Sequence, residues 1–228
     1  MKKTLSMILV LILSIVVLAG CNTTTETKVE EPDTQTEVVN EEASAKVITP
    51  LPETLDVNAL DNCTVAVSLE EGDAYVDDTG KMVMNVMVYS YELYDMIDIA
   101  ALAENDVIVR QNEEVTITEI ERLDTGLVRI NGGEENGGFD LATDDSTVYF
   151  EVGMNDMKAY TVLGEVTLPV SDVFRYTDAS DLDAEATIYH PGDFLTDAAG
   201  IEYSFSPNNT SIVIENGTII AMNKVYMP

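Results

Sequence analysis

Histidine, cysteine and tryptophan are nearly missing from this chain of 228 residues, which has one histidine, two cysteines and no tryptophan. A Ser-His-Asp or Cys-His catalytic system would have to use His190, and no Gly-x-Ser-x-Gly motif accompanies it. A zinc site would have to be completed by carboxylates, because so few nitrogen and sulfur ligands exist. We therefore interpret His190 as a loop residue, and we expect no cofactor.

Basic side chains are also few, since 11 Lys and Arg stand against 42 Asp and Glu. Two of the lysines and none of the acids precede Cys21, so a chain beginning at Cys21 has a formal charge of −33 (9 − 42). Such a charge repels nucleic acid and anionic membrane surfaces. It favours cationic peptides, basic proteins or divalent cations as partners, although solubility and distance from the cell surface explain it more simply.

The one marked apolar run lies at residues 5–17 (LSMILVLILSIVV), after Lys2 and Lys3, and it is too short to span a bilayer comfortably. Leu18-Ala19-Gly20 then leads into Cys21. This order resembles the lipobox signal peptide of bacterial lipoproteins. The resemblance implies cleavage before Cys21, lipid on its thiol, and an extracytoplasmic protein anchored to the cell membrane. An ordinary signal peptide or an uncleaved anchor is the alternative.

The composition divides the chain after this signal peptide, residues 1–20. Residues 21–49 are rich in Thr and Glu and contain no aromatic residue, so they predict a disordered acidic tether. Residues 50–228 contain many short strand-like runs between turn signals. We expect an all-β fold, mainly antiparallel and sandwich- or barrel-like, with one or two short helices. The length permits sub-lobes at 55–125 and 126–228.

The clearest local prediction is a C-terminal hairpin of residues 211–215 and 218–222. Asn216-Gly217 between them favours a type I′ turn, in which both central residues take positive φ. The predicted register places Ile214 opposite Ile219 and Val213 opposite Ile220. We further expect one strand over 115–123, with a bulge near Glu119.

Several side chains are interpreted as packing residues. If Cys21 carries lipid, Cys63 has no cysteine with which to form a disulfide. Because Cys63 also lies in a strand-like run, we expect it to be buried and unreactive. Met82 and Met84 share one face of a strand and Met87 points the other way, so the three do not converge as copper ligands would. We therefore interpret these methionines as residues that fill the hydrophobic core.

Two features are candidates for ligand binding. Tyr89 and Tyr91 share one face of a strand, and Tyr94 lies beyond it. These tyrosines are interpreted either as a platform for a ligand or as ordinary core or rim packing. The glycine-rich stretch 131–138 lacks the Gly-Lys-Ser/Thr ending of a phosphate-binding loop. We interpret it as a wide hairpin end, an exposed position where binding could occur.

Calcium is the most plausible ion, because it needs several oxygen ligands converging from a turn. The sequence of the candidate acids matches no EF-hand loop, and solvated acidic loops are the simpler interpretation. The candidate acids are Asp144, Asp145, Asp178, Asp181, Asp183 and Glu185.

Three functions follow from these features. The first is a non-catalytic binding module, for a protein or a cell-wall component, displayed on a lipid anchor. The second is a carboxylate-based hydrolase outside the cell, which would need two facing carboxylates. The third is a calcium-stabilised surface domain.

Overall fold

The computed structural model describes residues 44–145, 147–196 and 201–227. The signal peptide, Cys21 and most of the tether lie outside these residues. Within them the expected all-β fold is confirmed, because strands dominate and the helices α1 (Met96–Ala101) and α2 (Pro191–Phe194) are short. Among the described residues, no helix combines the length and apolar character needed to cross a membrane.

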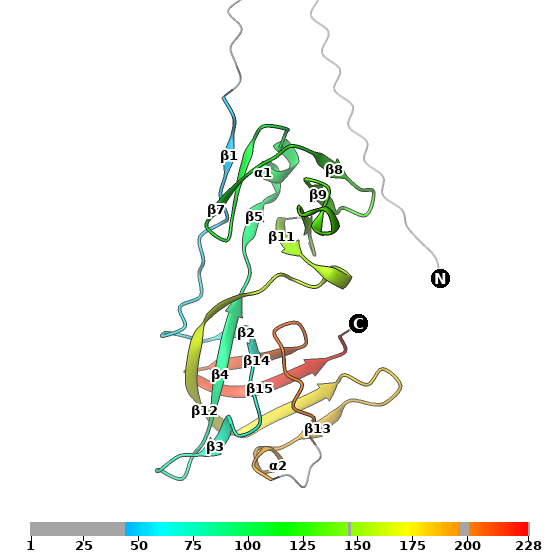
Figure 1. Ribbon diagram of the computed structural model, residues 1–228. Coiled ribbons are helices and arrows are strands. Elements are labelled where there is room, and N and C mark those ends of the chain that lie inside the picture. Colours follow the sequence, from blue (N-terminus) through cyan, green and yellow to red (C-terminus); the bar gives the residue numbers. More distant parts are fainter. Residues whose placement is uncertain (1–43, 146, 197–200, 228) are drawn as a thin grey trace, which may run out of the picture. The chain divides into compact units, whose positions relative to one another are not determined.

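Five strands form a closed barrel: β2 (Cys63–Ser68), β4 (Met82–Ser90), β12 (Thr161–Ala179), β14 (Thr210–Glu215) and β15 (Thr218–Val225). Their order around the barrel is β12-β15-β14-β2-β4, and β4 pairs back onto β12. Every pair is antiparallel except β12 with β15. This order makes a five-stranded Greek-key barrel (Figure 1).

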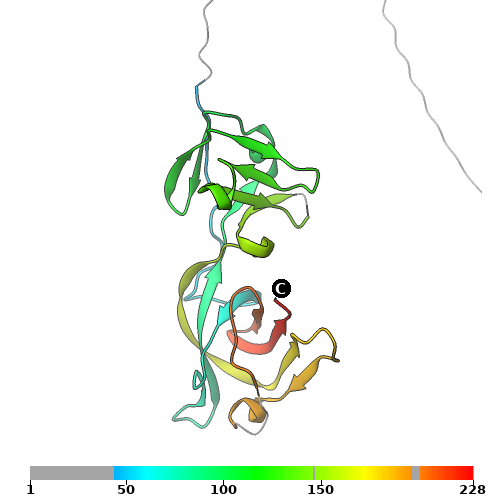
Figure 2. The same cartoon turned by 45° about the vertical axis from the view of Figure 1, so that its right-hand side comes forward.

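The 19-residue strand β12 closes the barrel by serving two neighbours in turn. Its first half, from Thr161 to Pro169, pairs with β4, and its second half, from Val170 onward, pairs with β15. Figure 2 shows the resulting curve of β12 around the barrel. Alternation along the strands directs apolar side chains inward, and the fully buried ones on β4 and β14 include Met84, Val88 and Ile212.

Shorter elements extend the barrel at one end. The strand β3 (Ala74–Val76) pairs with β4, and β13 (Thr187–Tyr189) pairs with β12. The helix α2 (Pro191–Phe194) inserts Phe194 against Phe174 and Tyr176, with ring centroids 6.0 and 5.1 Å away. An aromatic cluster therefore fills this end of the core.

The C-terminal hairpin confirms the predicted turn, and one of its two predicted pairs is wrong. Asn216 and Gly217 have φ of 51° and 66°, and Ile214 lies opposite Ile219. Val213 instead faces Ala221, because the register shifts between Val213 and Ile214. The irregularity leaves Ile212, Ile214 and Met222 all fully buried.

An insertion of about 70 residues, 91–160, connects β4 to β12 and forms a second hydrophobic cluster. Its elements are β5 (Leu93–Asp95), α1 (Met96–Ala101), β6 (Val107–Arg110), β7 (Glu113–Thr116), β8 (Ile120–Arg122), β9 (Val128–Ile130), η1 (Glu134–Asn136), β10 (Phe139–Ala142), β11 (Val148–Val152) and η2 (Met154–Asp156). They make one sheet ordered β5-β11-β10-β9-β8, and a second in which β6 pairs with β7.

The two clusters do not follow the expected division at residue 125. The barrel cluster includes residues from 60–88 and 168–222, and the insertion cluster includes Ile48 and residues from 94–141. The chain leaves the barrel after β4 and returns to it at β12. No change in composition marks either of these two points in the sequence.

The predicted tether 21–49 is too long at its C-terminal end. The strand β1 (Val47–Ile48) pairs in parallel with β6, and Ile48 is only 1% exposed. These two apolar residues are ordered because they add to an existing sheet edge, a partner that their own sequence does not reveal.

The predicted single strand over 115–123 is also wrong. The chain forms β7 and β8 separately, and the two belong to different sheets. The connection is braced by Asn131, whose Oδ1 accepts hydrogen bonds from the backbone of Thr118 and Glu119, and whose Nδ2 donates to the carbonyl of Thr116. What the sequence presented as a bulge is thus the crossing point between two sheets.

Candidate ligand-binding cleft

A cleft of about 420 Å³ lies on the outer surface of the barrel, over β2, β4, β14 and β15. Its floor includes a row of side chains in register across the four strands. Tyr89 lies opposite Ala66, Ala66 opposite Ser211, and Ser211 opposite Asn223. Because strands are about 4.8 Å apart, this row is about 14 Å long. The floor is therefore an extended surface of small and polar side chains.

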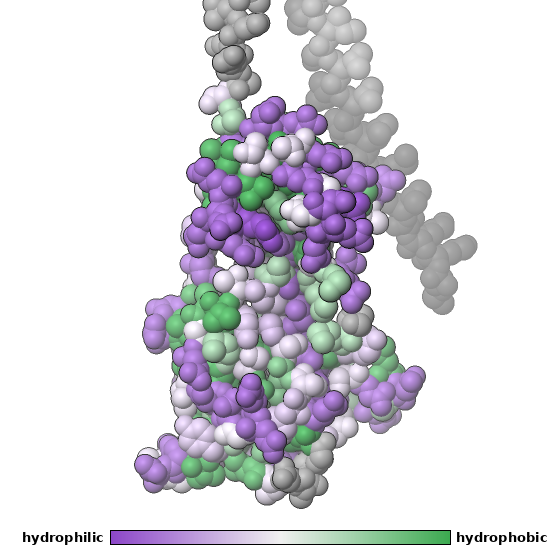
Figure 3. Space-filling model, viewed as in Figure 1, coloured by the Kyte–Doolittle hydropathy of each residue, from purple (hydrophilic) through white to green (hydrophobic). Residues whose placement is uncertain are grey.

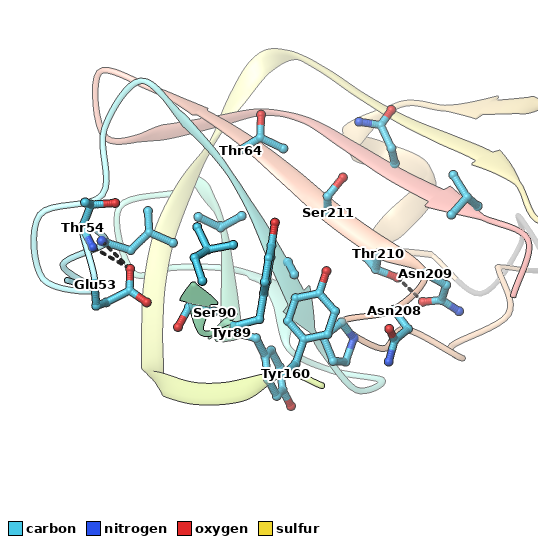
Figure 4. A pocket seen from close by; sticks show the side chains of 18 residues that line it. Glu53, Thr54, Thr64, Tyr89, Ser90, Tyr160, Asn208, Asn209, Thr210 and Ser211 are labelled. Atoms are coloured by element: carbon cyan, nitrogen blue, oxygen red, sulfur yellow. Dashed lines mark hydrogen bonds between the residues drawn. The ribbon is translucent and has the colours of Figure 1, made fainter. Parts of the chain in front are cut away.

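Three tyrosines form one wall of the cleft. Tyr160 meets Tyr89 with ring centroids 6.4 Å apart and Tyr91 with centroids 5.4 Å apart, both edge to face. The Tyr89 hydroxyl is within 2.9 Å of Ser68 Oγ. Figure 4 shows Tyr89 and Tyr160 side by side, between the Glu53–Thr54 turn and the Asn208–Asn209 turn. The wall thus presents aromatic ring surface together with phenolic hydroxyls.

The sequence identified part of this wall. Tyr89 and Tyr91 line the cleft together, whereas Tyr94 is fully buried in the insertion cluster. Burial, with Glu92 nearby, raises the pKa of Tyr94 far above its ordinary value. Sequence reasoning missed Tyr160, because only the pairing of β12 with β4 brings it back beside Tyr89.

Lys158 supports the tyrosine wall from behind. Its Nζ lies 4.5 Å from the ring centroid of Tyr91 and 4.3 Å from that of Phe150. The same ammonium donates to Asp144 Oδ2 at 2.8 Å and to the Tyr91 hydroxyl at 3.3 Å. Partial burial opposes the charge of Lys158, yet these hydrogen bonds prevail and its pKa is raised. Lys158 therefore remains a cation that fixes the position of Tyr91.

The two turns beside the wall are held by their own side chains. Glu53 Oε1 accepts hydrogen bonds from the backbone of Thr54 and Leu55, both at 2.8 Å. Asn209 is 6% exposed, accepts from Ser206 N and Thr210 Oγ1, and donates to the Ser204 carbonyl. The hydrogen bonds of Glu53 and Asn209 therefore stabilise these two turns. In the described part of the chain no side-chain hydrogen bond uses Asn208, Ser211 or Asn223.

A second cleft of about 710 Å³ adjoins the first. The two share Glu53, Thr54, Ser90, Tyr91 and Leu93, so Tyr91 contributes to both. The second cleft is lined more by apolar groups, such as Pro50, Pro52 and Leu163. The two clefts are therefore neighbours that share part of their lining.

The first cleft is nearly neutral, although the chain is strongly acidic. Of the described residues that line it, Glu53 alone carries a charge, and its Oε1 already closes a turn. The insertion holds 17 acidic and 4 basic residues within 91–160. In Figure 3 the strongly hydrophilic residues gather over the insertion, and the face of the barrel is paler. The acidic charge therefore does not line the floor or walls of this cleft.

The calcium candidates do not gather into a site. Asp178 accepts from Tyr176 and Ser180, and Asp181 accepts from the backbone of Asp183. Asp144 pairs with Lys158, and Asp145 accepts from Thr147. Among the residues that the structure describes, no three His, Cys, Asp or Glu side chains are placed to hold a metal ion.

The other residues that the sequence singled out have structural roles in the fold. His190 is exposed and precedes α2, where its backbone N–H donates to Asp193. Cys63 is partly buried, not fully buried as expected, and desolvation raises the pKa of its thiol. Met82 and Met84 pack in the barrel core, which confirms their assignment. The 131–138 loop joins β9 to β10 and does not line either cleft.

Comparison with known proteins finds no matching family model, no similar curated protein and no similar solved structure.

Proposed function

We propose that the protein is an extracytoplasmic lipoprotein, anchored to the membrane by lipid on Cys21, whose β domain binds a ligand without catalysing a reaction. The observation that carries the binding role is the cleft walled by Tyr89, Tyr91 and Tyr160. Its volume is within the range of about 300–1,000 Å³ that small-molecule sites occupy. The lipobox-like order of residues ahead of Cys21 supports the anchor.

The structure favours binding over the carboxylate-based hydrolase because of how the acids are used. Among the described residues, Glu53 is the one acid that lines the first cleft, and Glu92 joins it in the second. Glu92 accepts hydrogen bonds from the Tyr94 hydroxyl and the backbone of Gln111. Both carboxylates thus hold local structure. A hydrolase would need a pair free to act as acid and base on a substrate.

The anchor is tested by fractionating cells that express the chain with Cys21→Ser. We expect this variant to leave the membrane fraction or to remain unprocessed, while Cys63→Ser, the matched change at the other cysteine, stays membrane-bound. A processed, membrane-bound Cys21→Ser protein would refute the anchor.

Binding is tested by NMR on Cys21→Ser protein with labelled tyrosine rings, titrated with cell-envelope extract. Three of the 10 tyrosines line the first cleft, so their ring signals report on it and the other tyrosines serve as internal references. We expect the signals of Tyr89, Tyr91 and Tyr160 to shift together, and the ligand to be recovered chemically intact. Shifts confined to other tyrosines would move the site elsewhere, and a cleaved ligand would favour the hydrolase.

A further inference from the structure

We infer that the cleft recognises an uncharged oligosaccharide, a conclusion that rests on the binding function proposed above. The first step concerns charge. A site for a cationic or anionic ligand needs opposite charges within it, and this cleft offers Glu53 alone, with Oε1 occupied by two backbone N–H groups. The overall acidic charge also repels the phosphates of nucleic acids. The chemistry of the cleft therefore suits a neutral ligand.

The second step excludes recognition of a peptide as an added strand. That mode needs an open sheet edge with free backbone N–H and C=O groups. The row along the floor of the cleft is paired on both sides at its two central residues, because Ala66 on β2 lies between β14 and β4 and Ser211 on β14 lies between β15 and β2. Helix-in-groove binding needs a row of apolar anchor pockets, whereas the floor carries Thr64, Ala66 and Ser211.

The third step concerns what the cleft does supply. Its floor and rim carry hydroxyl and amide side chains on Thr64, Ser211, Asn208 and Asn223. Hydroxyls and amides both donate and accept, which matches the hydroxyl groups of a sugar. In Figure 4 Thr64 and Ser211 occupy one side of the cleft, and the Tyr89 and Tyr160 rings another. Tyrosine combines an apolar face, on which the C–H face of a sugar ring packs, with a polar hydroxyl.

The fourth step concerns length. The row from Tyr89 to Asn223 crosses four strands, or about 14 Å. Tyr91 at one end of this row also lines the second cleft. A single sugar ring would fill only part of the row. The geometry therefore points to a chain of several uncharged sugars, crossing the barrel from the tyrosine wall.

The test uses the Cys21→Ser chain on an array of uncharged glycans of four or more sugars, covering α- and β-linked glucose, mannose, galactose and N-acetylglucosamine. Tetragalacturonate, a 15-nucleotide oligothymidine and an uncharged octapeptide complete the probes. We expect at least one uncharged glycan to bind at least tenfold more tightly than tetragalacturonate. Tyr160→Ala should weaken that binding at least tenfold, and Tyr160→Phe should retain most of it.

Tyr75→Ala is the matched control, because Tyr75 is 44% exposed on β3 and lies outside both clefts. It should leave binding unchanged. If the octapeptide or the oligothymidine binds in a Tyr160-dependent way and no glycan does, the saccharide inference is overturned and the proposed binding function stands. If no probe binds, the saccharide inference is overturned, and if the cell-envelope extract then shifts none of the cleft tyrosines, the proposed binding function is overturned with it.

Discussion

The buried ammonium of Lys224 should be a major source of barrel stability. Lys224 is 2% exposed on β15, and its Nζ donates to Ser204 Oγ at 2.7 Å and to the Glu202 carbonyl at 3.3 Å. The same Nζ lies 5.4 Å from the centroid of the Phe205 ring. Lys224 lies opposite Asp178 in the parallel pairing of β12 and β15, and its charge lowers the pKa of Asp178. Removing this charge removes several interactions at once.

We expect Lys224→Met to lower the free energy of unfolding by about 2 kcal/mol. Hydrogen bonds of a charged group contribute about 1.5–3 kcal/mol each, and the relief of lysine desolvation offsets part of the loss. For a domain of this size the loss corresponds to a Tm about 4–8 °C lower. Thermal unfolding of the Cys21→Ser chain, followed by near-ultraviolet circular dichroism of its tyrosines, measures it.

Lys46→Met is the matched control. Lys46 pairs with the Asp98 carboxylate at 2.6 Å, but both side chains are more than 40% exposed. An exposed pair contributes less than about 1 kcal/mol, so its Tm should change little. Equal Tm values for the two variants would show that burial of Lys224 adds nothing to its interactions.

The pH dependence of stability provides an independent check on the same cluster. Burial would raise the pKa of Asp178, but hydrogen bonds from Ser180 and Tyr176 and the charge of Lys224 outweigh it, so the pKa is lowered from its ordinary 3.8. A lowered pKa stabilises the fold above the unfolded pKa, and the gain is lost as pH falls through the folded pKa. The Tm gap between wild type and Asp178→Asn should therefore shrink below pH 4. A constant gap from pH 6 to pH 2.5 would refute this.

Three further predictions follow from the insertion and the cleft. Gly138→Ala should unfold the insertion, because a Cβ there would collide with the backbone carbonyl oxygen of Ile130. A Cβ at Gly192 would meet nothing within 4 Å, so Gly192→Ala should be tolerated, and hydrogen exchange distinguishes the two variants. Arg110→Lys should lower the free energy of unfolding, measured in urea, by about 1–2 kcal/mol, because lysine cannot replace the bidentate contact of the guanidinium with the Glu151 carboxylate. Lys158→Met should broaden the Tyr91 ring signal in NMR and weaken glycan binding severalfold, and sharp, unshifted signals would contradict its supporting role.

The sequence predicts features that depend on neighbouring residues. Positive φ at Asn216-Gly217 is a local requirement, and the alternation that buries Met82 and Met84 is a local pattern. The all-β class follows from the same kind of signal. Each of these needs no knowledge of which strand lies next to which.

The errors lie where a distant partner decides. Val47 and Ile48 are ordered by β6, about 60 residues away, and the β7–β8 connection is fixed by Asn131. The wall of the cleft has the same origin. Tyr89 and Tyr91 are two residues apart on the chain, but Tyr160 joins them only because β12 returns to pair with β4 after the whole insertion.

The charge of the chain shows why composition is a poor guide to the ligand. A formal charge of −31 suggests a cationic partner, yet the described residues that line the first cleft include a single acid. Electrostatic fields of whole proteins govern solubility and encounter, whereas specificity comes from the groups that contact the ligand. Acidic residues spread over the insertion and tether keep the domain soluble and repel anionic polymers. In the binding function proposed above, the nearly neutral cleft on the barrel would select its ligand by shape, stacking and hydrogen bonding.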